Sequence, residues 1–270
     1  MIVQTEVYQQ RFTSGDLTSK IIERVKELAK ATDAARVSRE MLRYLEMASK
    51  FHKYSPGNIW LILMTRPDAS QVAGFQRWRS LNRFVRKGEK GIAILAPIFT
   101  PEDHDDPDSK QMLSGFKVVY VFDIAQTDGE PLPPPPDWKS PEQNDVLTQK
   151  LIAFANSRKI TVSVKRLSGE TQGVSKGGSI ELDPSAGTKT LIHEIAHELM
   201  HRGEDRPDDL RIRELEAESV AYVVGRHFGL EGLSSPNYVA IHGATSELIL
   251  AHLERIRKTS AEIISEVDCD

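Results

Sequence analysis

The sequence predicts an α+β fold made of two domains. Residues 131–136 are almost entirely proline, and such a run favours an extended polyproline II spacer over a packed element. On both sides of it, apolar residues recur at helical spacing in some stretches and at strand spacing in others. We therefore expect an N-terminal domain with helices and a small sheet at residues 1–130, a proline-rich linker at 131–139, and a second domain at 140–270.

Helices and a pair of strands are predicted for the N-terminal domain. A second helix is expected around residues 41–48, and residues 92–98 are apolar enough for a buried strand. Residues 116–122 fit as the partner of that strand, with a solvated acidic loop at 103–108 between them. The first helix is expected at residues 14–31, where apolar side chains recur at helical spacing: Leu17, Ile21, Val25 and Leu28.

Cationic and aromatic side chains alternate over residues 72–91. The formal net charge of the chain is only −4, so this basic stretch is a local feature. Such a patch suits single-stranded nucleic acid, because cations follow the phosphates while rings stack on unpaired bases at about 1–3 kcal/mol per base. The alternative is an ordinary solvated basic face with Phe75 and Trp78 buried beneath it, and the residues alone favour neither.

The second domain is predicted to contain a helix at residues 141–157 and a strand at 160–164. A further strand at 177–182 leads to a helix that begins near residue 185. Strands that precede an active helix can offer a sheet edge to an extended peptide. We hypothesise this role for residues 178–182.

The helix that follows carries the motif His-Glu-x-x-His at residues 193–197. Four residues make about one helical turn, so His193 and His197 leave the same face and can hold one zinc ion. Glu194 can take a proton from a zinc-bound water, whose pKa the ion lowers toward about 7. The motif is short, and the alternative is a buried helix whose histidines only satisfy hydrogen bonds.

A third ligand is expected on a second helix at residues 213–224, which is rich in acids and small residues. Glu214 and Glu218 share one face of it. We expect Glu214 to bind zinc and Glu218 to hydrogen-bond the free ring nitrogen of a ligand histidine. Glu216 is interpreted as a solvated surface charge, although a shifted register would exchange these roles.

His201 follows His197 by one turn and resembles a further ligand. We expect it instead to end the helix, where Arg202 and Gly203 follow and a cation suits the helix dipole.

Composition excludes several classes of protein. The single cysteine, Cys269, allows neither a disulfide within the chain nor a cysteine-based zinc site. No basic stretch followed by a long apolar one marks a secretory signal, and no run approaches the roughly 18 apolar residues of a membrane span. We expect a soluble, cytoplasmic protein with no membrane partner, whose oligomeric state the sequence leaves open.

Two separated blocks resemble the ArdC family of antirestriction proteins found on conjugative plasmids and other mobile elements. One block is similar to the single-stranded-DNA-binding domain of that family, and the other to its zincin-like metallopeptidase domain, which is related to the ImmA/IrrE peptidases. Together they extend over most of residues 15–265 in the order of the family. The blocks comprise Ser55–Asn58, Val72–Phe75, Trp78 and Val85–Ile92, then His193–His197 and Glu214–Val224.

The resemblance implies roles for individual residues. It implies that Arg86, Lys87 and Lys90 lie near phosphates, with Asn58, Trp78 and Arg83 as further contacts to single-stranded DNA. It agrees with a Zn²⁺ site formed by His193, His197 and Glu214, with Glu194 as the catalytic acid and base.

One position departs from the family pattern. His242 stands where relatives are expected to carry tryptophan. Tyr238 or His242 can therefore approach the site and stabilise an oxyanion, although burial of both explains them equally well.

The function predicted is that of a single-stranded-DNA-binding zinc metalloendopeptidase, gluzincin-like, of the antirestriction type. It would protect incoming DNA of a mobile element and hydrolyse peptide bonds of proteins at or near DNA. The main alternative is a DNA-binding protection protein whose zinc site is structural or nearly inactive. A nuclease or relaxase fits less well, because phosphate chemistry usually relies on magnesium and carboxylates.

Overall fold

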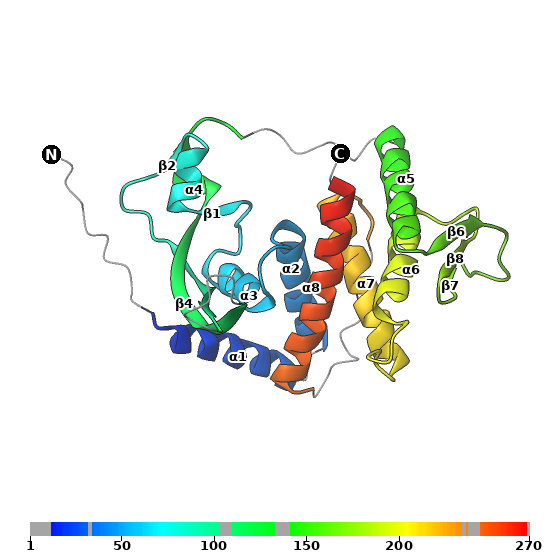
Figure 1. Ribbon diagram of the computed structural model, residues 1–270, viewed down its shortest axis with the longest axis horizontal. Coiled ribbons are helices and arrows are strands. Elements are labelled where there is room, and N and C mark those ends of the chain that lie inside the picture. Colours follow the sequence, from blue (N-terminus) through cyan, green and yellow to red (C-terminus); the bar gives the residue numbers. More distant parts are fainter. Residues whose placement is uncertain are drawn as a thin grey trace. The chain divides into compact units, whose positions relative to one another are not determined.

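The computed structural model describes residues 12–31, 34–102, 110–132, 141–233, 236 and 244–268 (Figure 1). The chain divides into two compact units. The N-terminal unit comprises Met1–Arg24 and Gly57–Pro133, and the C-terminal unit comprises Val25–Pro56 and Pro134–Asp270. Residues 25–56 thus group with the C-terminal part of the chain, whereas the sequence pattern predicts them in the first domain. Most of the predicted linker lies outside the described residues.

The N-terminal unit is built on a three-stranded antiparallel sheet in the order β1-β4-β3 (Figure 1). A second, two-stranded ladder joins β2 to β5. The strands are β1 (Val72–Gly74), β2 (Arg83–Val85), β3 (Ile92–Pro101), β4 (Gln111–Asp123) and β5 (Thr127–Gly129). The other elements are α3 (Pro56–Thr65), α4 (Phe75–Ser80), the short 3-10 helix η1 (Ile124–Gln126) and the part of α1 (Ser14–Lys30) up to Arg24.

The predicted strand pair is confirmed, since β3 and β4 form a long hairpin with Ile92 opposite Val121. The end of the hairpin at Ile92 and Val121 is buried. Toward its other end, the paired residues Phe99 and Leu113 are exposed. Helix α3 is apolar on all sides, and its Ile59, Trp60 and Ile62 are completely buried. A helix without a polar face is stable only inside a core, and the burial of α3 fits this role.

The C-terminal unit is mainly helical, with a small sheet beside α6 (Figure 1). The helices are α2 (Ala34–Lys50), α5 (Pro141–Ser157), α6 (Thr188–Met200), α7 (Leu210–His227) and α8 (Ser246–Asp268). The strands are β6 (Thr161–Val164), β7 (Gly173–Ser175) and β8 (Ser179–Leu182). Helix α7 packs against α6, α8 and α2, so it forms the centre of the helical layer.

The sheet of the C-terminal unit corrects one hypothesis. Its order is β6-β8-β7, with β8 parallel to β6 and antiparallel to β7. Because β8 is hydrogen-bonded on both sides, residues 178–182 cannot accept an added peptide strand. The edge strand beside α6 is β7.

The sequence pattern gave no prediction for α8, although Ile249, Leu253, Ile256 and Ile263 recur at helical spacing and are buried. Within the described residues, no helix combines the length and the apolar character that crossing a membrane requires.

Candidate metal centre

Helix α6 presents one apolar face and one face of potential ligands. Leu191, Ile192 and Ile195 are buried and anchor the helix in the core of the unit. The histidines of the motif leave the other side, toward the first turn of α7. The side chain of Asp209 caps α7 by accepting a hydrogen bond of 2.9 Å from the Arg211 amide, which fixes where this helix begins.

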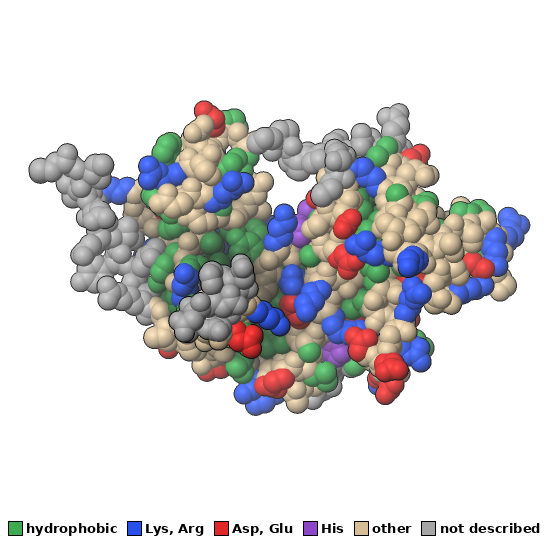
Figure 2. Space-filling view, in the orientation of Figure 1, with side chains coloured by type: hydrophobic (Ala, Val, Ile, Leu, Met, Phe, Trp, Pro, Cys, Tyr) green, Lys and Arg blue, Asp and Glu red, His purple; other side chains and the backbone are tan. Residues whose placement is uncertain are grey.

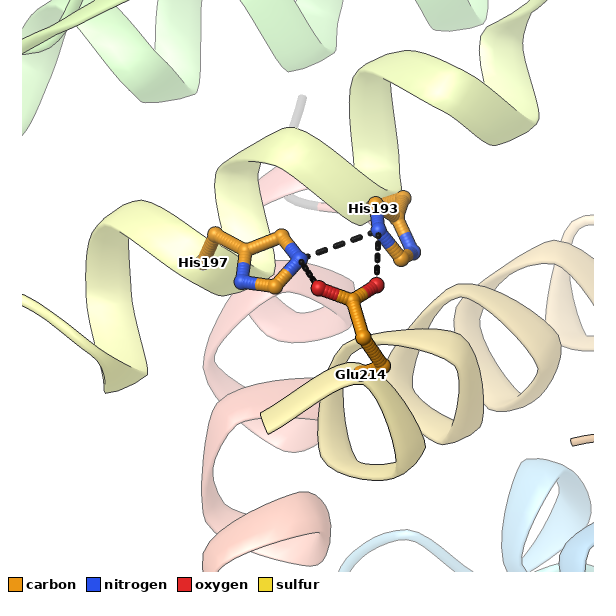
Figure 3. A group of neighbouring side chains, drawn as sticks. All are labelled: His193, His197 and Glu214. Carbon is orange, nitrogen blue, oxygen red and sulfur yellow. Dashed lines mark hydrogen bonds and ion pairs between the residues drawn. The ribbon is translucent and has the colours of Figure 1, made fainter. Parts of the chain in front are cut away.

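Three side chains converge where α6 and α7 face each other (Figure 3). The Nε2 atoms of His193 and His197 are 3.0 Å apart. The two carboxylate oxygens of Glu214 lie 3.4 Å from these nitrogens, one from each. A tetrahedral ion with bonds of about 2.0–2.1 Å holds its ligands about 3.3 Å apart, so the donor set fits one divalent metal ion.

The charges of this group favour a cation next to the ionised carboxylate of Glu214. Hydrogen bonds to His193 and His197 lower the pKa of Glu214 despite its partial burial. Burial disfavours the charged form of His193, but Glu214, Glu194 and Glu218 outweigh this effect and raise its pKa. The surroundings of His193 thus favour a positive charge at this point, which a metal ion can also supply.

Glu194 lies beside these ligands, packed against the edge strand β7. It is 7% exposed, and burial raises the pKa of its carboxyl group. A Cβ atom at Gly173 would lie 2.8 Å from both Cγ and Oε1 of Glu194. Only glycine at residue 173 therefore leaves room for the carboxylate in this position.

The turn between β7 and β8 is attached to α6 through Glu198. One carboxylate oxygen accepts hydrogen bonds from Ser175 Oγ (2.6 Å) and the Gly177 amide (2.7 Å), and the other accepts one from the Gly178 amide (2.6 Å). Gly177 and Gly178 have φ angles of 74° and 114°, which side-chain-bearing residues rarely adopt. Glu198 thus fixes the strand that flanks the ligands.

Glu216 is not the surface charge that the sequence pattern predicts. Its side chain is fully buried between α6 and α8, where it contacts His201, His252 and Arg255. These partners lower its pKa to about 2, although burial acts in the opposite direction. The prediction was wrong because Glu216 leaves α7 on the side that α8 covers.

His201 ends α6 as expected, but its side chain is not an exposed cation. The residue is 8% exposed, and burial lowers the pKa of its ring. Its Nδ1 lies 3.0 Å from Nδ1 of His197, and its Nε2 lies 2.9 Å from Glu216.

Glu218 lies near His193, the other candidate ligand histidine. Its Oε1 is 3.8 Å from His193 Nδ1, longer than a hydrogen bond, and its Oε2 forms an ion pair of 3.1 Å with Lys189. Tyr238 and His242, the predicted stabilisers of an oxyanion, lie outside the described residues.

An open cleft of about 950 Å³ contains the three candidate ligands, His193, His197 and Glu214, together with Glu194. Strand β7 and the following turn form one wall, and the start of α7 forms another. Four cationic side chains also line the cleft: Lys176, Arg202, Arg206 and Arg213. Lys176 is paired with Glu181 and Arg202 with Glu198. This metal cleft is large enough to admit an extended peptide segment.

The N-terminal unit holds the side chains predicted to contact DNA, and three of them are buried. Asn58 exchanges two hydrogen bonds with the backbone of Leu95, at 2.8 and 2.9 Å. Trp78 is 2% exposed and donates from its indole to Phe122 O. Arg83 donates to Thr127 and to neighbouring carbonyl groups. All three side chains support the surface from within.

The remaining predicted residues are exposed on a turn between β2 and β3. Arg86 forms a 2.7 Å ion pair with Glu89, and Gly88 has a φ angle of 88° that lets the chain reverse. Lys87 and Lys90 are exposed beside this pair.

Two phenylalanines of the same basic stretch are also exposed, Phe75 on α4 at 47% and Phe84 on β2 at 58%. Figure 2 shows cationic side chains beside hydrophobic ones over α4 and β2. We call the exposed residues Phe75, Arg77, Arg79, Phe84, Lys87 and Lys90 the basic aromatic surface.

Residues 6–126 match the family described as the N-terminal domain of anti-restriction factor ArdC. Residues 6–126 thus belong to the ArdC N-terminal domain family. An uncharacterized protein of Bacillus anthracis is 24% identical over 319 residues, which cover 95% of this chain and 54% of that protein. The chain therefore spans about half the length of this relative.

Two crystal structures of the antirestriction protein ArdC from plasmid R388 are similar to this chain. The metal-free structure is 19% identical with a TM-score of 0.48, covering 79% of this chain and 85% of that one. The Mn(II)-bound structure is 17% identical with a TM-score of 0.49, covering 85% and 98%.

Several residues that shape the candidate site were not predicted. Gly173 and Glu198 belong to no short motif, and only their contacts reveal them. His252 and Arg255 lie on α8, whose helical spacing was available in the sequence as a signal.

Proposed function

We propose that this ArdC-like chain is a DNA-binding, metal-dependent peptidase of the antirestriction type. The observation that carries the proposal is the convergence of His193, His197 and Glu214 in an open cleft that also contains Glu194. Two histidines and one glutamate are a donor set typical of catalytic zinc. The protein would act on proteins at or near the DNA of an incoming mobile element.

The proposed reaction is hydrolysis of a peptide bond. His193, His197 and Glu214 would hold a divalent ion, which when bound polarises a carbonyl group and lowers the pKa of water. The carboxylate of Glu194 would take a proton from the attacking water and return it to the leaving amine. The edge strand β7 would align the substrate by adding the peptide as a further strand.

The main alternative is a protection protein whose metal is structural. A structural zinc site is usually closed by four protein ligands, whereas three ligands beside open space leave a position for substrate. A structural site also has no use for Glu194, which occupies a buried position that costs its carboxylate solvation. Both features favour catalysis.

The test compares the wild type with Glu194→Gln, Glu214→Gln and the control Glu204→Gln. Glu204 is an exposed acid outside the ligand set. Each protein is loaded with Zn²⁺ or Mn²⁺, the second ion being that of the R388 ArdC crystal structure, and its metal content is measured. Each is then incubated with casein, with and without single-stranded DNA.

We expect Glu194→Gln to retain metal and lose cleavage, and Glu214→Gln to lose metal. The control should behave as the wild type does. Metal binding without cleavage by the wild type under any of these conditions would favour the protection protein.

The substrate preference proposed for this site follows from the cationic lining of the cleft. Arg206 is an exposed member of this lining, so acidic peptide segments should bind better than neutral ones. We expect Arg206→Gln to raise KM for acidic peptides without changing kcat/KM for neutral ones. Equal effects on both classes of peptide would contradict the preference.

The DNA-binding part of the proposal rests on the basic aromatic surface. Phe75 and Phe84 would stack on unpaired bases, while Lys87 and Lys90 would contact phosphates. Arg86 is a poor test residue because its ion pair with Glu89 also holds the turn.

The double change Lys87→Gln and Lys90→Gln should weaken binding to single-stranded DNA. A plot of the logarithm of the DNA association constant against the logarithm of the salt concentration should become less steep. Its slope should decrease in magnitude by about 0.7 for each lost phosphate contact. Phe84→Ala should weaken binding without changing that slope. Lys258→Gln, an exposed lysine of α8, serves as the control. Unchanged DNA affinity in the double variant would exclude this surface.

A further inference from the structure

Glu216 is the centre of a buried network that reaches one of the proposed metal ligands. Its Oε2 lies 2.9 Å from Nε2 of His201, and Nδ1 of His201 lies 3.0 Å from Nδ1 of His197. Its Oε1 accepts hydrogen bonds from His252 Nδ1 at 2.7 Å and Arg255 Nε at 3.0 Å. A continuous chain therefore runs from the carboxylate through His201 to His197.

The proton positions in this chain follow from one condition. If Nε2 of His197 binds a metal, it carries no hydrogen, so Nδ1 of the neutral ring must carry one. Nδ1 of His201 can accept that hydrogen bond only if it carries no hydrogen itself. The hydrogen of the neutral His201 ring is then on Nε2. A carboxylate accepts that hydrogen, and Glu216 supplies one.

We propose that His201 and Glu216 are positioning residues that hold His197 in the ring orientation and tautomer required for metal binding. The inference rests on the proposed metal site. In this arrangement the rings of His197 and His201 each donate one hydrogen bond along the chain. The chain ends at the buried carboxylate of Glu216. Hydrogen bonds of this kind to a ligand histidine fix the ring and increase its basicity.

The two ligand histidines differ in this respect. His193 Nδ1 is buried without a hydrogen-bond partner among the described residues, and the nearest carboxylate oxygen, on Glu218, is 3.8 Å away. His197 is therefore the ligand whose geometry the protein fixes in advance.

A matched control exists within the same network. His252 is as buried as His201 and donates to the same carboxylate, but among the described residues neither of its ring nitrogens is hydrogen-bonded to a candidate ligand histidine. Loss of either ring removes one hydrogen bond to Glu216. Only loss of His201 interrupts the chain to His197.

The experiment measures the affinity of the 270-residue chain for Zn²⁺ by competition with a chromogenic chelator. The variants are His201→Leu, His201→Asn, His252→Leu and Glu216→Gln, and the thermal stability of each metal-free protein is measured beside its affinity. Leucine removes the acceptor for His197, whereas the Oδ1 atom of asparagine can take its place. Glu216→Gln keeps the size of the side chain and removes its charge.

We expect His201→Leu to weaken Zn²⁺ binding by about 10–100-fold and His201→Asn to recover much of that loss. His252→Leu should bind Zn²⁺ as the wild type does, even if its stability falls equally. Glu216→Gln should weaken Zn²⁺ binding because a neutral amide holds His201 less strongly than a carboxylate does. If His201→Leu does not fold, the Zn²⁺ affinity of Glu216→Gln is the deciding measurement.

Unchanged affinity in His201→Leu, or in Glu216→Gln when His201→Leu does not fold, would overturn the proposal. Equal losses in His201→Leu and His252→Leu would overturn it too, because they would indicate general destabilisation. A wild type that binds neither Zn²⁺ nor Mn²⁺ would overturn the proposed metal site itself, which is a different result.

Discussion

At the scale of a single residue, Gly173 limits where the carboxylate of Glu194, the proposed catalytic residue, can lie. It lies on the edge strand β7, and Glu194 approaches it more closely than any larger residue would allow. The helix that carries Glu194 is anchored by buried side chains and cannot easily move away. Any added atom at residue 173 must therefore displace the carboxylate itself.

We predict that Gly173→Ala lowers kcat strongly while Zn²⁺ content stays at the wild-type level. The reason is the Cβ atom that would lie 2.8 Å from Glu194 Oε1. Peptide hydrolysis and metal content are measured on the same preparation. Gly115→Ala, which has no atom within 4 Å of the added Cβ, is the control. An unchanged kcat would show that Glu194 does not act from this position.

His52 is a buried ring that makes the stability of the C-terminal unit depend on pH. Burial, the nearby His227 ring and Lys53 lower its pKa from 6.5 to about 4, although Asp268 acts in the opposite direction. Between pH 6.5 and 4 the unfolded chain thus binds a proton that the folded chain does not. The free energy of unfolding therefore falls as pH decreases through this window and levels off below it.

We predict a loss of up to about 3 kcal/mol from this residue on going from pH 7 to pH 4. The measurement is urea unfolding of metal-free protein at several pH values. His52→Gln should lose less stability over the same range than the wild type. Equal pH dependence in both proteins would contradict the assignment to His52.

At the scale of elements, the β7–β8 hairpin depends on Glu198. The two glycines of the turn direct their amide groups at this carboxylate, which lies on α6 next to a ligand. A short strand pair is marginally stable alone, so the hairpin depends on the helix for its position. The wall of the metal cleft is therefore set by the same helix that presents the histidines.

We predict that Glu198→Gln destabilises the hairpin by about 1–3 kcal/mol, because an amide cannot accept all of these hydrogen bonds. Faster hydrogen exchange at the amides of residues 173–179, with little change in α8, would be the direct observation. KM for peptides should rise. Unchanged exchange in the hairpin would show that the turn is held by other contacts.

At the scale of the whole molecule, α2 belongs to the C-terminal unit although the N-terminal unit follows it in sequence. Met41 and Leu45 are buried, and α2 packs against α7. The hydroxyl group of Tyr222 donates to Glu46 at 3.3 Å. A cut at the proline-rich run would remove this helix from the unit that contains the candidate metal centre.

We predict that a fragment of residues 140–270 unfolds without a cooperative transition and binds Zn²⁺ weakly. A chain that joins residues 25–56 to 134–270 through a long flexible linker should fold and bind Zn²⁺ as the full protein does. Calorimetry and chelator competition provide the comparison. A fragment of residues 140–270 with full-length affinity would show that α2 is dispensable.

Local patterns determined much of this protein. Helical spacing predicted α1, α6 and α7, and apolar continuity predicted the β3–β4 pair, because these signals depend on neighbours within a few residues. The spacing of His193 and His197 likewise follows from helix geometry alone. The face of the helix that carries Glu214 also followed from helical spacing, once this helix was assumed to face α6.

The tertiary structure decided the rest, because burial depends on which elements pack together. Glu216 and Glu214 are two residues apart in sequence, yet α8 covers the first and the metal cleft exposes the second. Trp78 and Arg83 belong to the basic run but point into the core, which leaves Phe75 and Phe84 exposed. The sequence by itself determined the candidate ligands as residue types at a spacing. Only packing decided which charged side chains are buried and which face solvent.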